Sequence, residues 1–197
     1  MYTKTFFASS LLALAATAAP TNTTFSDLET RGAQDTFKLH IYNNCHFVKE
    51  VALYQVTSDF KMIQKSTPTN VGKRGGSITI EAPFQATGMR LSGHAEMGTD
   101  AQWNPQAMFE FGHSTYAGVQ GTAYDLSVMQ GSDHDIGIGA YPIPNGRGSK
   151  YCPSKTCFPW HCPPSQGWTN PDQVNQGSPA DTVCYKGKTD FKVVFCP

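Results

Sequence analysis

The sequence lacks an excess of charge of either sign. It holds 15 Lys and Arg residues against 15 Asp and Glu residues, and no block of like charge occurs along it. Nucleic acids and anionic membranes attract proteins through clustered basic residues, so neither is an expected partner.

The sequence also lacks a helical pattern, because no window of a dozen residues repeats apolar side chains at a period of 3.6. A mainly helical fold is therefore excluded.

A hydrophobic run long enough to span a bilayer is missing as well. The longest apolar stretch runs from Phe6 to Ala16, follows Lys4, and ends in small residues before Pro20. This layout is typical of a secretory signal, and the run is too short for a transmembrane helix. We predict a signal peptide at residues 1–19, cleaved near Ala18 or Ala19, and an extracellular protein.

In the stretch after the predicted signal, the apolar residues repeat at a period of neither 2 nor 3.6. We interpret residues 20–35 as a flexible leader or a propeptide cut after Arg31. Asn22 begins the only N-glycosylation sequon, which predicts a glycoprotein. Residues 36–197 are enough for one domain and too few for two ordinary ones, and we expect a monomer.

Metal-binding patterns are also absent. The histidines form no His-x-His or His-Glu-x-x-His motif, and the cysteine spacing lacks the paired knuckles of a zinc site. We therefore expect neither a metal nor a cofactor. The six cysteines all follow the signal, and an even number in an oxidising compartment predicts three disulfides, for which fifteen connectivities are possible.

Short alternations of apolar and polar residues fill most of the chain and predict an all-β sandwich or barrel of antiparallel strands. In the last of them, Phe191, Val193 and Phe195 share one face. The segment from Asn145 to Asp181 is different: it is rich in Pro and Cys, hardly alternates, and is interpreted as a disulfide-pinned loop region. The predicted strands are FKLHIYN from Phe37, VKEVALYQV from Val48, SITIEA from Ser77, GMRLSG from Gly88, AMFEFGH from Ala107, AYDLSVM from Ala123, DIGIGAY from Asp135 and FKVVFC from Phe191.

Three stretches, in this order, resemble the thaumatin-like family, which includes plant proteins of the osmotin and zeamatin type and secreted fungal relatives. They are KLHIYNNCHFVKEVALYQV from Lys38, FEFGHSTYAGVQGTAYDLSVMQG from Phe109, and the terminal TDFKVVFCP from Thr189. The resemblance covers roughly residues 36–197 and implies a thaumatin-like β-sandwich. The reduced loop region indicates a small-type member, more typical of a filamentous fungus than of a plant.

The resemblance implies how the cysteines pair. In that family the first cysteine bonds the last, which implies Cys45–Cys196 here. It further implies Cys152–Cys184 and Cys157–Cys162, with the second disulfide-rich domain of larger members reduced to the few residues FPWH.

The resemblance also implies an acidic cleft. Matched residue by residue, the family's arginine is Arg90, its glutamate is Glu110 and its first aspartate is Asp125. The second aspartate is replaced by Gln130, and the last is matched by Asp172 if two residues are inserted. The alternative for Arg90 and Glu110 is a single structural salt bridge.

The functional hypotheses follow from this cleft. Hydrolysis of a β-glucosidic bond needs one protonated carboxyl and one carboxylate, about 5 to 9.5 Å apart, and Glu110 as acid with Asp125 as nucleophile or base could supply them. Gln130 cannot ionise, so the cleft is better suited to gripping sugar hydroxyls than to cutting the chain. The family resemblance, the predicted signal peptide and the loss of one cleft carboxylate together give the leading hypothesis, a secreted protein that binds cell-wall β-1,3-glucan and acts in wall remodelling, conidial germination or antimicrobial (antifungal) defence. The alternatives are an endo-β-1,3-glucanase and a secreted effector or inhibitor that binds a host protein.

Aromatic side chains in or beside loops are candidates for stacking on sugar rings, although burial in a core is the commoner fate of an aromatic. Of these, Tyr124 and Trp168 are the strongest candidates. The full set is Trp103, Tyr116, Tyr124, Tyr141, Trp160 and Trp168.

Overall fold

The computed structural model describes residues 36–197 apart from positions 60, 85, 98–106, 117, 129–135, 144–151, 159, 170–172 and 174–180, with the backbone alone at 116 and 181–186. The regular secondary structure of the described residues is almost entirely strand, with one short 3-10 helix, η1 (Ala95–Met97). No helix within these residues is long and apolar enough to cross a membrane. The strands are β1 (Thr36–Asn43), β2 (Lys49–Val56), β3 (Met62–Gln64), β4 (Thr69–Val71), β5 (Gly76–Pro83), β6 (Met89–Ser92), β7 (Met108–Tyr116), β8 (Val119–Ser127), β9 (Ile138–Ile143), β10 (Lys155–Cys157), β11 (Asp181–Lys186) and β12 (Asp190–Phe195).

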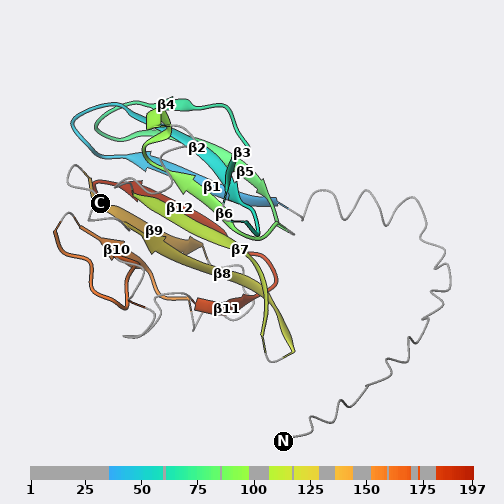
Figure 1. Ribbon diagram of the computed structural model, residues 1–197. Helices are drawn as coiled ribbons and strands as arrows, with labels where there is room; N and C mark the ends of the chain where they lie inside the picture. Colours follow the sequence, from blue (N-terminus) through green and yellow to red (C-terminus); the bar gives the residue numbers. More distant parts are fainter. Residues whose placement is uncertain are drawn as a thin grey trace, which may run out of the picture.

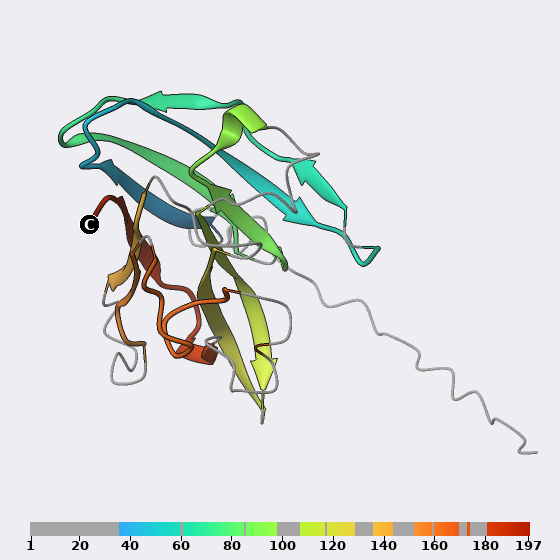
Figure 2. The same cartoon turned by 60° about the vertical axis from the view of Figure 1, so that its left-hand side comes forward.

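The strands form two packed sheets, as Figures 1 and 2 show from two directions. The first has the order β10-β9-β12-β1-β5, and the second has the order β11-β8-β7-β6-β2-β3 with β4 also pairing with β2. This arrangement confirms the predicted all-β sandwich. The β7–β8 hairpin projects beyond the rest of the molecule in both views.

One strand pair departs from the antiparallel rule. β1 and β12 run parallel, with Leu39 opposite Phe191 and Asn43 opposite Phe195, whereas the other strand pairings of the described residues are antiparallel. Because β12 also pairs with β9, the last strand lies inside the sheet instead of at its edge. The beginning and the end of the domain therefore lie side by side (Figure 1).

The core lies between the sheets and is built from the alternating apolar residues of both. Phe191, Val193 and Phe195 are fully buried, as their spacing predicted, and so are Phe37, Leu39 and Ile41 of β1. Phe37 meets Phe111 of the opposite sheet edge to face, at a centroid distance of 5.2 Å. Such cross-sheet aromatic pairs add to the stabilisation that burial of their area provides.

Two of the three predicted disulfides are present. Cys45 bonds Cys196 and Cys157 bonds Cys162. Cys152 is disulfide-bonded too, but the side chain of Cys184 lies outside the described residues, so the Cys152–Cys184 pair stays a prediction. Disulfides of this kind fit an oxidising, extracellular compartment.

Candidate functional site

Three ionisable side chains form one row across three neighbouring strands. Arg90 on β6 lies opposite Glu110 on β7, and Glu110 lies opposite Asp125 on β8. Successive side chains of a strand point to opposite faces, and the neighbours Leu91, Phe111 and others are core residues. The row therefore lies on the face of the sheet that is turned away from the core.

A pocket of about 370 Å³ opens beside this row. Two positions back along the chain from the ends of this row, Gly88 and Ala123 have little or no side chain and leave space next to it, whereas the space beside Gly112 is filled by the backbone of Ala86 and Thr87. The pocket is lined by Val56, Gly88, Met89, Arg90, Glu110, Phe111, Ala123, Tyr124 and Asp125.

Arg90 and Glu110 form an ion pair in which the Arg90 Nε donates to the Glu110 Oε1. Both side chains are only 19% exposed, so water screens the pair less than it would at an open surface. Arg90 and Glu110 therefore form the salt bridge that was the alternative to a ligand-binding role, and the same two residues also line the pocket. A structural role and a ligand-binding role are compatible here.

Asp125 is the most perturbed acid of the described residues. Burial, followed by the charge of Glu110 and a hydrogen bond with it, raises the pKa of the Asp125 carboxyl well above its usual value, while a hydrogen bond from Trp168 and the charge of Lys155 act in the opposite direction. Its Oδ1 atom is buried and has no hydrogen-bond partner among the described residues. Asp125 therefore keeps its proton at pH values where an exposed aspartate has lost it.

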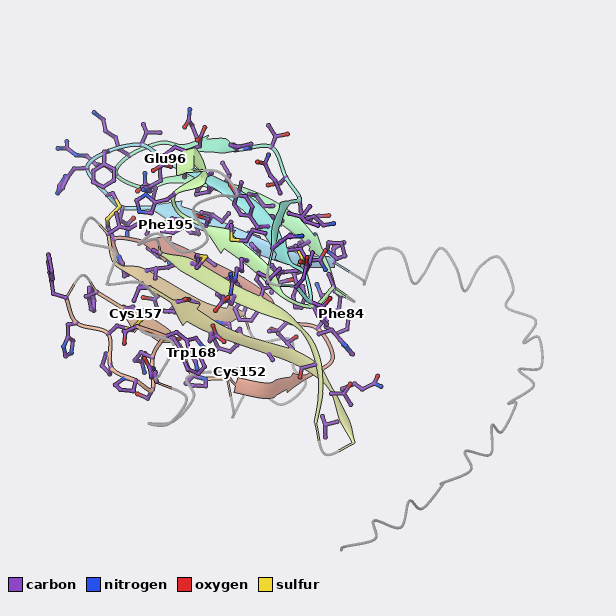
Figure 3. The ribbon with its side chains drawn as sticks, in the orientation of Figure 1. Phe84, Glu96, Cys152, Cys157, Trp168 and Phe195 are labelled. Atoms are coloured by element: carbon purple, nitrogen blue, oxygen red, sulfur yellow. A yellow bond between two sulfur atoms is a disulfide. The ribbon has the colours of Figure 1, made fainter. Side chains whose placement is uncertain are left out.

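Trp168 and Lys155 were not expected beside Asp125. The backbone of Trp168 is bonded to β8, with its N–H donating to the Leu126 carbonyl and its carbonyl accepting from Val128, and its side chain is thereby held near Asp125. The next residue back, Gly167, packs against the Cys157–Cys162 disulfide, and Figure 3 shows Cys157 and Trp168 in this part of the molecule. No local pattern predicts these contacts, because they join segments that are distant in sequence.

Tyr124 belongs to the core, which corrects its assignment as a sugar-stacking residue. Its side chain is 2% exposed, its ring lies 4.9 Å from that of Phe191, and its hydroxyl donates to the Pro153 carbonyl. Because neighbours along a strand point to opposite faces, Asp125 and Tyr124 cannot both present their side chains on the outer face. The Tyr124 ring is therefore not available to a ligand.

Several predicted residues lie outside the described part of the chain. These include Gln130, Asp172, Trp103, the sequon at Asn22 and the cleavage site at Arg31. Their roles remain predictions. Within the described part, no group of three or more His, Cys, Asp or Glu side chains is placed to hold a metal ion.

Comparison with known proteins supports the fold. The structure resembles that of the protein elicitor MoHrip2 from Magnaporthe oryzae, with a TM-score of 0.52 and 14% identity over 82% of this chain and 99% of that chain. It also matches the thaumatin-like xylanase inhibitor TLXI, with a TM-score of 0.46 and 14% identity over 81% of this chain and 99% of that one. No protein-family model and no curated protein sequence matches. The fold and the site together define a disulfide-bonded β-sandwich of two sheets, with a pocket lined by Arg90, Glu110 and Asp125 on its outer face.

Proposed function

We propose that this protein is secreted and binds cell-wall β-1,3-glucan, without cleaving it, in the pocket beside Arg90, Glu110 and Asp125. The observation that carries the proposal is the convergence of these three side chains on one cavity. The guanidinium donates hydrogen bonds, the carboxylate accepts them, and a protonated Asp125 can do both. Sugar hydroxyls both donate and accept, so this mixture suits a neutral, polyhydroxylated ligand better than a charged one. Such binding would serve wall remodelling, conidial germination or antimicrobial defence.

The spacing of the two carboxyls supports binding over catalysis. Glu110 and Asp125 are hydrogen-bonded to each other, whereas the two carboxyls of a glycosidase lie about 5 to 9.5 Å apart and leave room for the sugar and water. Two carboxyls that share a hydrogen bond leave less room between them than this mechanism uses. A non-catalytic site is the simpler reading of this geometry.

A glucanase remains the second candidate, because one observation favours it. A carboxyl that keeps its proton beside a carboxylate is the combination that glycoside hydrolysis needs. The raised pKa falls on Asp125, so the roles would be the reverse of the expected ones, with Asp125 as the acid and Glu110 as the base or nucleophile.

One experiment separates these candidates. The mature protein is incubated with laminarin, and bound polysaccharide and new reducing ends are both measured. We expect binding without reducing ends, and at least about tenfold weaker binding for Glu110→Gln, which corresponds to the loss of about 1.4 kcal/mol. Glu81→Gln is the matched control, because Glu81 is exposed on β5 of the other sheet.

The other outcomes are equally informative. Reducing ends that appear with the wild-type protein and vanish with Glu110→Gln would establish the glucanase and overturn the binding-only proposal. Neither binding nor turnover would overturn both and favour an effector or inhibitor that recognises a host protein.

A further inference from the structure

A small disulfide-closed loop lies apart from the pocket and displays two aromatic side chains. It runs from Cys157 to Cys162, and the backbones of Phe158 and His161 bond each other in both directions within it. Trp160 is 74% exposed and Phe158 is 47% exposed, and Trp160 is the most exposed large apolar residue of the described chain. The loop follows β10, the edge strand of the five-stranded sheet.

The backbone at Trp160 is in an unfavourable conformation. Its φ is +66°, in the left-handed region that glycine adopts freely and bulky residues rarely enter. Such conformations persist only where the surrounding structure imposes them, and they cluster at functional sites. A glycine at position 160 would relieve the backbone strain. Local backbone preference therefore does not explain why an exposed tryptophan occupies this position.

We infer that this loop, here named the aromatic loop (residues 157–162), is a second contact site for the same glucan chain, with Trp160 as its stacking platform. The inference rests on the proposed function. The loop contains no Lys, Arg, Asp or Glu, which suits a neutral ligand, and a sugar ring has an apolar face that packs on a flat aromatic surface. The disulfide and the paired backbone hydrogen bonds hold the loop in shape before binding, which lowers the entropic cost of association.

The size of the loop favours a sugar over a protein partner. An aromatic side chain buries about 150 to 250 Å², so the two rings supply at most about 500 Å². A stable protein interface needs about 800 Å² from each partner. One sugar ring needs only the face of a single indole.

The loop and the pocket are linked through the chain. The disulfide of the aromatic loop packs on Gly167, which also lies against the Leu126 carbonyl, and the next residue, Trp168, reaches Asp125. From Leu126 back to Ala123 at the pocket is three residues of one strand, or about 10 Å. The disulfide at the base of the loop is thus about this far from the pocket, and a polymer long enough to reach Trp160 as well would gain at the second contact from a high effective concentration.

The test compares a polymer with a short ligand. Affinities for laminarin and for laminaribiose are measured with the wild-type protein, Trp160→Ala, Trp160→Phe and the matched control Phe47→Ala, whose ring is 44% exposed between β1 and β2. We expect Trp160→Ala to bind laminarin about tenfold more weakly, a change of about 1.4 kcal/mol, and to bind laminaribiose as the wild type does. Trp160→Phe should recover much of the loss, and Phe47→Ala should change neither affinity.

Two further measurements test whether Trp160 contacts the polysaccharide and whether its substitution leaves the fold intact. Addition of laminarin should shift the tryptophan emission of the wild-type protein to shorter wavelength, and Trp160→Phe should lack most of that shift. Melting temperatures should stay unchanged for Trp160→Ala, because the side chain is mostly exposed. If the wild type binds laminarin and Trp160→Ala binds it equally well, the aromatic loop is not a glucan site while the proposed function stands. If the wild type binds no laminarin, both fail.

Discussion

Asp125 shows how the environment of one residue sets its chemistry. It lies on a strand face next to an acid, and its carboxyl is buried; these two causes raise its pKa, and burial is the larger. The hydrogen bond from Trp168 and the charge of Lys155 reduce the shift without cancelling it. The folded protein therefore binds a proton that the unfolded chain releases above about pH 4.

This residue makes the stability of the protein depend on pH. A group whose pKa is raised on folding stabilises the protein below its unfolded pKa, and this contribution is lost as the pH rises toward the folded pKa. We expect the melting temperature to fall as the pH rises above about 4, and we expect Asp125→Asn to flatten that slope and to raise the melting temperature at the upper end of the pH series. Thermal melts of both proteins at a series of pH values provide the measurement.

Asp59 offers a matched control of opposite sign. Hydrogen bonds from Lys61 and Thr57 lower the pKa of this exposed carboxyl, so its contribution is present above its unfolded pKa and is lost as the pH falls through the lowered value. Asp59→Asn should leave the slope described above in place. An unchanged slope in Asp125→Asn would show that Asp125 is not the buried acid responsible.

At the scale of elements, the β7–β8 hairpin decides which side chains meet. Its strands are joined between Tyr116 and Val119 by two residues, including Gly118 with a φ of +79°, and this connection sets the register that pairs Glu110 with Asp125. A slip by one residue would turn one carboxyl toward the core. The site thus depends on the turn as much as on the acids.

Gly112 on the same hairpin leaves room for a neighbouring turn. A Cβ there would lie 2.9 Å from the Ala86 carbonyl oxygen and 3.3 Å from the Thr87 Cα, both backbone atoms. We expect Gly112→Ala to lower the free energy of unfolding by about 1 to 3 kcal/mol, as overpacking usually does, and to weaken laminarin binding by displacing the turn that leads to Gly88. Urea unfolding and the binding assay measure the two effects.

Gly72→Ala is the control for this prediction. A Cβ at Gly72 would meet only the Gly76 Cα at 3.9 Å, an ordinary contact, so both stability and binding should stay close to wild type. Equal behaviour of the two variants would show that the turn is not packed on Gly112.

At the scale of the whole molecule, the chain is closed on itself. β1 and β12 pair in parallel, and the Cys45–Cys196 disulfide joins residues 151 positions apart next to that pair. Cross-linking a loop of this length removes much of the entropy of the unfolded chain. The first and last strands therefore stabilise the two-sheet core together.

Removing this disulfide should cost more than removing the short one. Loop entropy predicts a loss of about 5 kcal/mol for Cys45→Ala/Cys196→Ala and about 2 kcal/mol for Cys157→Ala/Cys162→Ala, whose cysteines are 5 positions apart. Urea unfolding of both double variants tests the difference. Similar losses would show that strain or local packing, and not loop length, sets the contribution of each disulfide.

Much of this architecture can be predicted from local patterns. Eight strands follow from alternation, because burial of one face imposes a period of two. The strands that were missed include β3, β4 and β10, each three residues long, which is too short to show a period. The parallel pairing of β1 with β12 has no local signal, since it joins opposite ends of the chain.

The amino-acid sequence alone specified the all-β class and the inward faces of the strands, because these depend on properties of adjacent residues. The three candidate site residues, Arg90, Glu110 and Asp125, came from the resemblance to the thaumatin-like family. The burial of Tyr124 could also have been predicted from the sequence, because Tyr124 precedes Asp125 on the same strand and must point to the opposite face. Only the tertiary structure decided that Arg90 pairs with Glu110, that Trp168 and Lys155 act on Asp125, and that Gly88 and Ala123 line a pocket beside them. These contacts join distant segments, and their energies depend on burial and on distances that no local pattern contains.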